Sequence, residues 1–283
     1  MIKKVCDMTI LVTGGHGQLG SELSDVLPNA IYAGSKDLDI TKWSDVQNFV
    51  KQNNIDTIIN CAAYTNVDGA ESDQYRAKQI NAFGPRNLVE TNCNLIHVST
   101  DYVFDGNISR PYNEKDMPNP KSVYGYTKML GEREVLFAKQ PAIVIRTSWL
   151  YSKYGKNFLK TMQRLGAEKS QINVVNDQIG NPTYAADLAR AIVDIIPQMN
   201  LKNKGIYHFS NEGACSWYAF ACEIMKLSGL NCVVNPIPSS QYPTIARRPF
   251  YSALDKTKIK DVFGIKIDTW QNALNRCINE NSK

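Results

Sequence analysis

The chain has 283 residues, 43% of them hydrophobic, so it is long and apolar enough to bury the core of one or two domains. Its formal charge of +5, from 32 basic and 27 acidic residues, is spread along the sequence without Lys/Arg blocks, which argues against a nucleic-acid or polybasic membrane site. Seven cysteines without a C-x-x-C pair, and three histidines without metal-ligand spacing, predict reduced thiols in a cytoplasmic protein and no zinc site.

No apolar run approaches the roughly 20 residues that span a bilayer, and no signal-peptide pattern follows the N-terminal lysines, so we expect no membrane partner. Residues 1–7 precede the first expected strand and are expected to form a short extension with no role in the fold.

The first two thirds of the chain alternate short β-rich apolar runs with longer helical patterns, which is typical of βαβ units. Strands are predicted at 9–13, 30–33, 56–60, 95–99 and 142–147. Helices are predicted at 17–27, at 42–52 with Thr41 as N-cap, at 73–92 with Pro85 as a kink, and at 123–138. The predicted fold class is α/β, with a Rossmann-like doubly wound parallel sheet.

The rhythm changes after Trp149: helical patterns at 153–165 and 184–198 are separated by shorter strands and by loops rich in Pro, Asn and Gly. We therefore expect an NAD(P)-binding domain at 1–150, completed by 177–200. The remainder, 151–176 and 201–283, is expected to form a smaller mixed α/β substrate-binding lobe, with a loop at 241–254.

The first expected strand runs into a glycine turn, "TGGHGQLG", with Gly14, Gly17 and Gly20 spaced by three and three. Glycine allows a tight turn and lets backbone N–H groups approach a pyrophosphate at the start of a helix. A strand before the turn and a helix after it favour nucleotide binding.

Acidic and basic residues follow at the distance where a dinucleotide's adenosine is usually bound. Asp39 lies nineteen residues after Gly20, with Asp37 as a competitor for the ribose. Lys36, beside Ser35, offers positive charge to a 2′-phosphate. This favours NADPH over NADH, which stays a second option. Ala62 and Ala63, at the end of the third strand, are small enough for a ligand to lie against them, or for close helix packing.

A Tyr-x-x-x-Lys pair, Tyr124 and Lys128, would share one helix face. An ammonium about 4 Å from the phenol is worth about 4 kcal/mol at a dielectric constant near 20, enough to lower the tyrosine pKa by at most roughly 3 units. Tyr124 would then be a general acid, and the hydroxyl of Thr100 at the fourth strand's end would hold a substrate carbonyl oxygen.

These motifs resemble the extended short-chain dehydrogenases and, within them, the dTDP-4-dehydrorhamnose reductases. The resemblance runs over nearly the whole chain, in "TGGHGQLG", "NCAAYTNVDGAE", "INAFGPRNL", "VSTDYVFDG", "YGYTKMLGE", "IRTSWLY", "DQIGNPTYAADLA" and "RRPFYSALD". It implies reduction of the C4 keto group of dTDP-6-deoxy-L-lyxo-4-hexulose to dTDP-L-rhamnose by NAD(P)H, the last step of dTDP-L-rhamnose synthesis.

The resemblance also implies roles for individual residues. The catalytic group would be Thr100, Tyr124 and Lys128. The cofactor would contact Gly14, Gly17, Gln18, Leu19, Asp39, Ile40, Ala62, Ala63, Tyr64, Tyr124 and Lys128. The sugar nucleotide would contact Val67, Thr100, Asp101, Tyr102, Tyr124, Trp149, Asn157 and Arg248.

One departure and two alternatives accompany this interpretation. Some family members bind magnesium through glutamates at a dimer interface; Glu22 matches one ligand, but Ala186 stands where another glutamate is found, so we expect no metal there, and a homodimer stays open. The same fold and motifs also occur in a non-enzymatic regulatory subunit of methionine adenosyltransferase. A reductase or epimerase of another nucleotide sugar is the other alternative.

Overall fold

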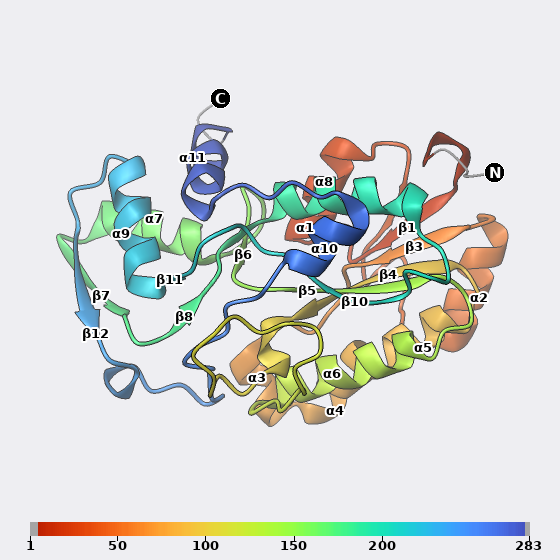
Figure 1. Cartoon of the computed structure of the whole chain (residues 1–283), viewed down its shortest axis with the longest axis horizontal. Helices are drawn as coiled ribbons and strands as arrows, with labels where there is room; N and C mark the ends of the chain where they lie inside the picture. The colour runs from red at the N-terminus through yellow and green to blue at the C-terminus, as the bar shows by residue number, and fades with distance from the viewer. Residues whose placement is uncertain (1–4, 281–283) are drawn as a thin grey trace.

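The computed structural model describes residues 5–280, which form a six-stranded parallel sheet with helices on both faces and a second lobe beside it (Figure 1). The strand order is β10-β5-β4-β3-β1-β2. The strands are β1 (Ile10–Thr13), β2 (Ile31–Ala33), β3 (Thr57–Asn60), β4 (Asn94–Thr100), β5 (Ala142–Thr147) and β10 (Gly205–His208). Because the chain runs outward from β1 to β2 and then returns to β3, the order reverses beside β1, where open α/β sheets bind ligands.

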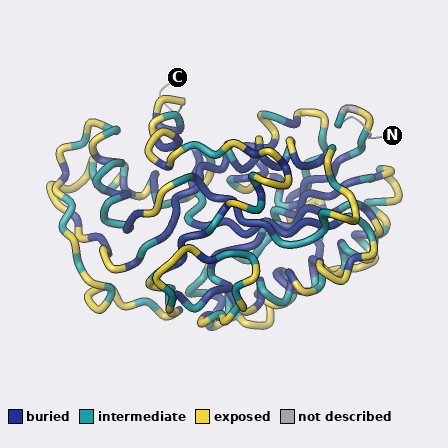
Figure 2. Tube along the Cα trace, in the orientation of Figure 1, coloured by how far each residue is buried: buried dark blue, intermediate teal, exposed yellow. Residues whose placement is uncertain are grey.

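The four central strands, β1, β3, β4 and β5, are buried on both faces, which explains why they are rich in apolar residues (Figure 2). In register across the sheet, Val12, Ile59, Ile96 and Ile143 face one core. Their neighbours along each strand face the opposite core, which is formed with different helices.

The first core is completed by α1 (Gln18–Val26), α8 (Ala185–Ile195) and α10 (Thr257–Phe263), and the opposite core by α2 (Trp43–Gln52), α5 (Gly84–Val89) and α6 (Val123–Leu136). Leu23 and Ile192 pack in the first core, and Val46, Leu88 and Val135 pack in the second. The predicted fold class is confirmed, and the five predicted strands lie close to their expected positions.

The helix expected at 73–92 is divided into α4 (Gln74–Lys78), the π-turn η2 (Gln79–Phe83) and α5. Pro85 lies at the start of α5, since a proline lacks the N–H that a continuing helix requires. A short helix, α3 (Val67–Ser72), precedes them and was not expected. Thr41 does not cap α2, because its hydroxyl donates to Asp39 instead.

The second lobe has its own apolar core, which includes Leu159, Phe220 and Leu274. Its strands are β6 (Leu150–Tyr151), β7 (Gln171–Val175), β8 (Ile179–Gly180), β9 (Thr183–Tyr184), β11 (Cys215–Ser216) and β12 (Val233–Ile237). Its helices are α7 (Phe158–Glu168), α9 (Trp217–Leu227) and α11 (Trp270–Glu280). The first of these begins later than its sequence pattern suggested, because Asn157 caps it by accepting a hydrogen bond from the Lys160 N–H. Short 3-10 turns are η1 (Val5–Asp7), η3 (Asp101–Val103), η4 (Ile196–Gln198) and η5 (Ser239–Gln241).

The division into lobes differs from the expected boundaries at β10 and α10. Both come from the segment assigned to the second lobe, yet β10 pairs with β5 as an edge strand, and Ile259 and Phe263 of α10 pack in the sheet core. Val5 also packs against that core, whereas residues 1–4 of the expected extension lie outside the described residues. Among residues 5–280, no helix combines the length and apolarity needed to cross a membrane.

Candidate active site

A cleft of about 1760 Å³ lies at the carboxyl ends of β1, β3 and β4, with Trp149, Asn157 and Trp217 of the second lobe on its other side. Single-ligand pockets are usually about 300–1000 Å³, so this cleft has room for two ligands end to end. It therefore matches a site that binds a dinucleotide beside a substrate.

The glycine turn forms one end of the cleft. Gly14 has a φ of +67°, and a Cβ there would lie 2.7 Å from the backbone nitrogen of Ala62, so only glycine fits this crossing. The next helix, α1, has Gly17 as its N-cap and no side chain capping it. Its first N–H groups are thus available to an anion, as a dinucleotide pyrophosphate requires.

Charged residues lie at the adenosine end of the cleft. Asp39 accepts hydrogen bonds from the hydroxyl and the N–H of Thr41, and the hydroxyl contributes most to lowering the pKa of that carboxyl. Asp37, the competing candidate, accepts a hydrogen bond from the Gly34 N–H at 2.8 Å. Lys36 also lines the cleft. The residues present therefore fit an NAD(P) cofactor.

Thr100, Tyr124 and Lys128 meet in the middle of the cleft. Thr100 ends β4, and the other two lie one turn apart on α6, whose N-cap is Ser122. The Thr100 hydroxyl donates to Asp101 Oδ1 at 3.2 Å and accepts from the Tyr102 N–H. The sequence motifs are thus brought together by the strand end and the helix face that carry them.

Burial determines the proton affinities of this group. Burial raises the pKa of Tyr124 to about 12, against a smaller lowering by its hydrogen bond with Thr100. Burial also lowers the pKa of Lys128 to about 8, while Glu132 opposes that change. The Lys128 amine donates to the Val98 carbonyl at 2.6 Å. The lysine-induced lowering of the Tyr124 pKa, expected from the helical spacing, is therefore not found, and Tyr124 is protonated at neutral pH.

Two further titratable groups border the catalytic residues. Asp101 is 2% exposed, and burial raises its pKa to about 6; its Oδ2 has no hydrogen-bond partner among the described residues. Burial raises the pKa of the Cys61 thiol to about 12, which makes it a poor nucleophile.

An aromatic pair closes the other end of the cleft. Trp149 has a φ of +48°, which is rare for a bulky residue, and its ring stacks on Trp217 with centroids 3.6 Å apart. Gly180 leaves the space for this ring, since a Cβ there would lie 2.6 Å from it. Trp217 was not among the predicted site residues, because nothing in its sequence context distinguishes it from a core aromatic.

Every predicted site residue except Arg248 lines the cleft. Arg248 instead forms an ion pair with Asp68 at 3.0 Å. Asn157 lines the cleft, but its amide nitrogen donates to Gln18 and to the Ser152 carbonyl, so it also connects the two lobes.

The residues around Glu22 do not fit a metal ion. Glu22 accepts a hydrogen bond from the Ser152 hydroxyl at 2.5 Å, and burial raises its pKa. The neighbouring Asp25 is paired with Lys153, whose ammonium would repel a cation. Within residues 5–280 no group of three or more His, Cys, Asp or Glu residues is arranged to hold a metal.

A Rossmann-like sheet whose cleft leads from a phosphate-binding turn to a Tyr–Lys helix places the chain in the class of extended short-chain dehydrogenases. Comparison of the sequence and structure with known proteins identifies the family within this class. The family model described as RmlD substrate binding domain matches residues 8–283. A dTDP-4-dehydrorhamnose reductase of Aggregatibacter actinomycetemcomitans is 41% identical, over 94% of this chain and 96% of its own.

Two solved structures agree with the family match. The dTDP-4-dehydrorhamnose reductase of Clostridium acetobutylicum superimposes with a TM-score of 0.93 at 39% identity, over 98% of this chain and 100% of its own. That of Bacillus anthracis, in complex with NADP, gives 0.92 at 39% identity, over 96% and 99%. The chain belongs to the dTDP-4-dehydrorhamnose reductase family.

Proposed function

We propose that the cleft reduces the C4 keto group of dTDP-6-deoxy-L-lyxo-4-hexulose (dTDP-4-dehydrorhamnose) to give dTDP-L-rhamnose, the last step of dTDP-L-rhamnose biosynthesis. The chain is an NAD(P)H-dependent oxidoreductase acting on a CH–OH group. The observation that carries the proposed site is the convergence of Thr100, Tyr124 and Lys128 on one cleft that also holds the glycine turn.

The cofactor, when bound, supplies a hydride from nicotinamide C4 to C4 of the sugar. The chain's own residues then manage the charge that develops on the keto oxygen. Tyr124, protonated at neutral pH, donates its hydroxyl proton to that oxygen. The Thr100 hydroxyl holds the same oxygen by a hydrogen bond. Lys128 would hold the nicotinamide ribose.

The second lobe would hold the sugar nucleotide. The stacked Trp149 and Trp217 offer an apolar face for the deoxysugar, with Val67, Asp101 and Tyr102 around it. Asn157 lies on the same side. Arg248 is proposed to bind the diphosphate, for which it would exchange its carboxylate partner Asp68 for a phosphate.

The test is NADPH and NADH oxidation, followed by absorbance, with enzymatically prepared dTDP-6-deoxy-L-lyxo-4-hexulose. Formation of dTDP-L-rhamnose, identified by chromatography, supports the proposal and ranks the two cofactors. Oxidation only with a UDP- or GDP-linked keto sugar would move the assignment to another nucleotide sugar. Cofactor binding without any oxidation would favour the role of a non-enzymatic regulatory subunit of methionine adenosyltransferase.

We also propose a cytoplasmic location, which the free thiols of the six described cysteines favour.

A further inference from the structure

We propose that Asn60 and His97 are positioning residues for Lys128, because they fix the direction of a buried hydrogen-bond chain that presents an imidazole N–H to the lysine amine. The inference rests on the proposed roles of Lys128 and Tyr124. Neither Asn60 nor His97 lines the cleft, and both are fully buried beneath it. Asn60 is the last residue of β3, and His97 lies in the middle of β4.

The direction of the chain begins at a backbone N–H. Asn60 Oδ1 lies 3.2 Å from the Ala62 backbone nitrogen and 2.7 Å from the Thr13 hydroxyl. A backbone N–H can only donate, so the Asn60 side-chain oxygen must face it. The Asn60 amide nitrogen therefore faces His97, with 2.9 Å between Asn60 Nδ2 and His97 Nδ1.

The amide fixes the histidine tautomer. An amide NH₂ group only donates, so Nδ1 of His97 must accept with a lone pair. Burial, and then the positive charge of Lys128, lower the pKa of His97 well below its ordinary value of 6.5, so the ring is neutral. A neutral imidazole carries one N–H, which is consequently at Nε2, 3.3 Å from Lys128 Nζ.

An N–H facing Lys128 favours one charge state of the amine. An ammonium can donate to the Val98 carbonyl, 2.6 Å away, but it meets the His97 N–H head to head. A neutral amine can donate to Val98 and also accept from His97. The network therefore stabilises the neutral amine and makes the ammonium a readier proton donor.

Other titratable groups around Lys128 do not reverse this effect. Glu132 lies one turn further along α6, but its carboxylate is paired with Arg146 of β5 at 2.6 Å and accepts from Ser99. Cys61, after β3, has a pKa of about 12 and is a neutral thiol. The pKa values of Tyr124 on α6 and Asp101 on η3 are both raised by burial.

The proposal gives the lysine a defined step. When Tyr124 protonates the sugar oxygen, its O–H bond breaks and a phenolate remains. The Lys128 ammonium returns a proton to that phenolate and becomes a neutral amine. This amine accepts a hydrogen bond from the His97 N–H until it regains a proton from solvent.

Nitrogen-15 NMR of the histidine-labelled, full-length protein tests the tautomer without substrate or cofactor. His208 is an internal control, since its Nδ1 faces the Tyr112 carbonyl at 3.1 Å and must carry the proton. We expect His97 to show the opposite tautomer, with a bare Nδ1 and a protonated Nε2, throughout the neutral range. Protonation of His97 at Nδ1 would overturn the proposal.

A variant that reverses the hydrogen bond between residue 60 and His97 tests the consequence for Lys128. In Asn60→Asp, the carboxylate accepts from Nδ1 of His97, so that Nε2 becomes the acceptor and favours the ammonium. NADPH affinity should fall as the pH rises and Lys128 loses its proton. In the variant, the midpoint of this loss should lie about one pH unit higher, which is a tenfold increase in the proton affinity of Lys128. Thr13→Val, which removes a second donor to Asn60 without reversing any bond, should leave the midpoint in place.

A folded Asn60→Asp protein with an unchanged midpoint would contradict the proposal. If that variant does not fold, the tautomer measured in the unaltered protein decides. Failure of the proposed reaction is a separate result, because it would abolish NADPH oxidation while leaving the His97 tautomer and the affinity midpoint as described.

Discussion

Tyr124 is the residue whose chemistry is easiest to isolate, because a neighbouring tyrosine on the same helix points to solvent. Tyr124→Phe removes the proposed proton donor but keeps the ring that packs edge to face on Tyr102. The kcat should fall by about 10²- to 10⁴-fold, the usual contribution of a general acid, with NADPH affinity nearly unchanged. Tyr126→Phe is the matched control, since Tyr126 is half exposed, and its kcat should not change. Equal turnover in the two variants would remove Tyr124 from the mechanism.

Asp101 carries a second residue-level prediction, for stability. Its folded-state pKa of about 6 lies above the ordinary 3.8, so the folded protein binds the proton more tightly than the unfolded chain. The buried carboxylate therefore lowers stability fully above pH 6, and this cost disappears as the pH falls below 3.8.

Asp101→Asn should remove that cost while still accepting from the Thr100 hydroxyl. We expect the free energy of unfolding to rise by about 2–3 kcal/mol at pH 7.5 and to be nearly unchanged at pH 3.5, measured by urea denaturation. A variant with no gain at pH 7.5 would show that Asp101 has a favourable partner in the folded protein.

At the scale of elements, α9 meets the loop after β5 through the stacked rings of Trp217 and Trp149. An aromatic pair contributes about 0.5–1.5 kcal/mol, and the Trp149 ring of this pair is carried by a residue in the left-handed backbone conformation. Trp217→Leu should raise the KM for the sugar nucleotide about three- to tenfold while NADPH affinity stays constant. Trp43→Leu, on the exposed surface of α2, should change neither constant. An equal loss of NADPH affinity would place Trp217 on the cofactor side.

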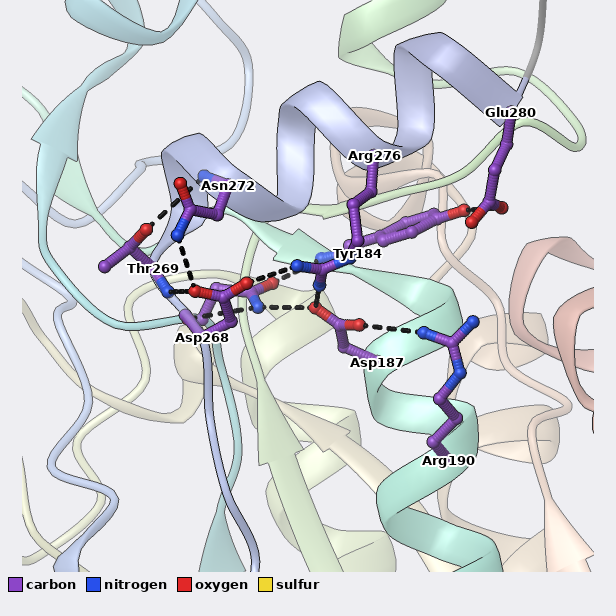
Figure 3. Close-up of polar contacts among 9 residues, drawn as sticks. Tyr184, Asp187, Arg190, Asp268, Thr269, Asn272, Arg276 and Glu280 are labelled. Carbon is purple, nitrogen blue, oxygen red and sulfur yellow. Dashed lines mark hydrogen bonds and ion pairs between the residues drawn. The ribbon is translucent and has the colours of Figure 1, made fainter.

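Arg276 joins the C-terminal helix α11 to α8 (Figure 3). Arg276 reaches Asp187 of α8 at 2.6 Å and also pairs with Asp268, while Arg190 contacts the other oxygen of Asp187. Asp187 is only 13% exposed, so loss of Arg276 leaves a poorly solvated carboxylate with Arg190 as its remaining cationic partner.

Arg276→Met should lower the free energy of unfolding by about 1–2 kcal/mol, with a smaller loss at high salt. Arg164→Met is the comparison, because the Arg164–Glu168 pair lies on an exposed helix face and contributes about 0.5 kcal/mol or less. Equal losses in the two variants would show that the ion pairs of Arg276 with Asp187 and Asp268 (Figure 3) are as well solvated as that surface pair.

Element types were predictable where the local pattern and the tertiary environment agree. The predicted central strands are apolar because both faces are covered, and α6 begins at its predicted residue, Val123, because Ser122 caps it. The pattern failed where tertiary contacts decide, as at Thr41, whose hydroxyl binds Asp39 rather than α2. The interruption before Pro85 was expected, but its form as a π-turn was not.

At the scale of the whole molecule, the cleft is the meeting place of both lobes. Hydrogen bonds that join the two lobes include Glu22 with Ser152, and Gln18 with Asn157. We therefore expect the two lobes to unfold together, in one transition. NADPH at a hundred times its Kd should raise the free energy of unfolding by about 2.7 kcal/mol in that same transition, measured by denaturation with and without cofactor. Two separate transitions, only one of them shifted, would show that the lobes fold independently.

The site was largely predictable because its parts lie in short motifs at strand ends and on one helix face, which parallel sheets bring to one edge. Features that depend on distant parts of the chain were not. The Arg248–Asp68 pair joins residues 180 positions apart, and the stacking of Trp217 on Trp149 depends on how the second lobe folds over the sheet. The proton affinities of Tyr124 and Lys128 depend on burial, which helical spacing does not specify.

The late position of β10 and α10 in the chain has a consequence for biosynthesis. As the protein emerges from the ribosome, β5 is made long before its neighbour β10, and the whole stretch from β6 to β9 intervenes. Until β10 has appeared, β5 is an open edge of the nascent sheet, and until α10 has appeared, part of one apolar face is uncovered. A ribosome that stalls near residue 200 would release a fragment with a complete nucleotide-binding turn but an exposed strand, which is a target for chaperones and proteases.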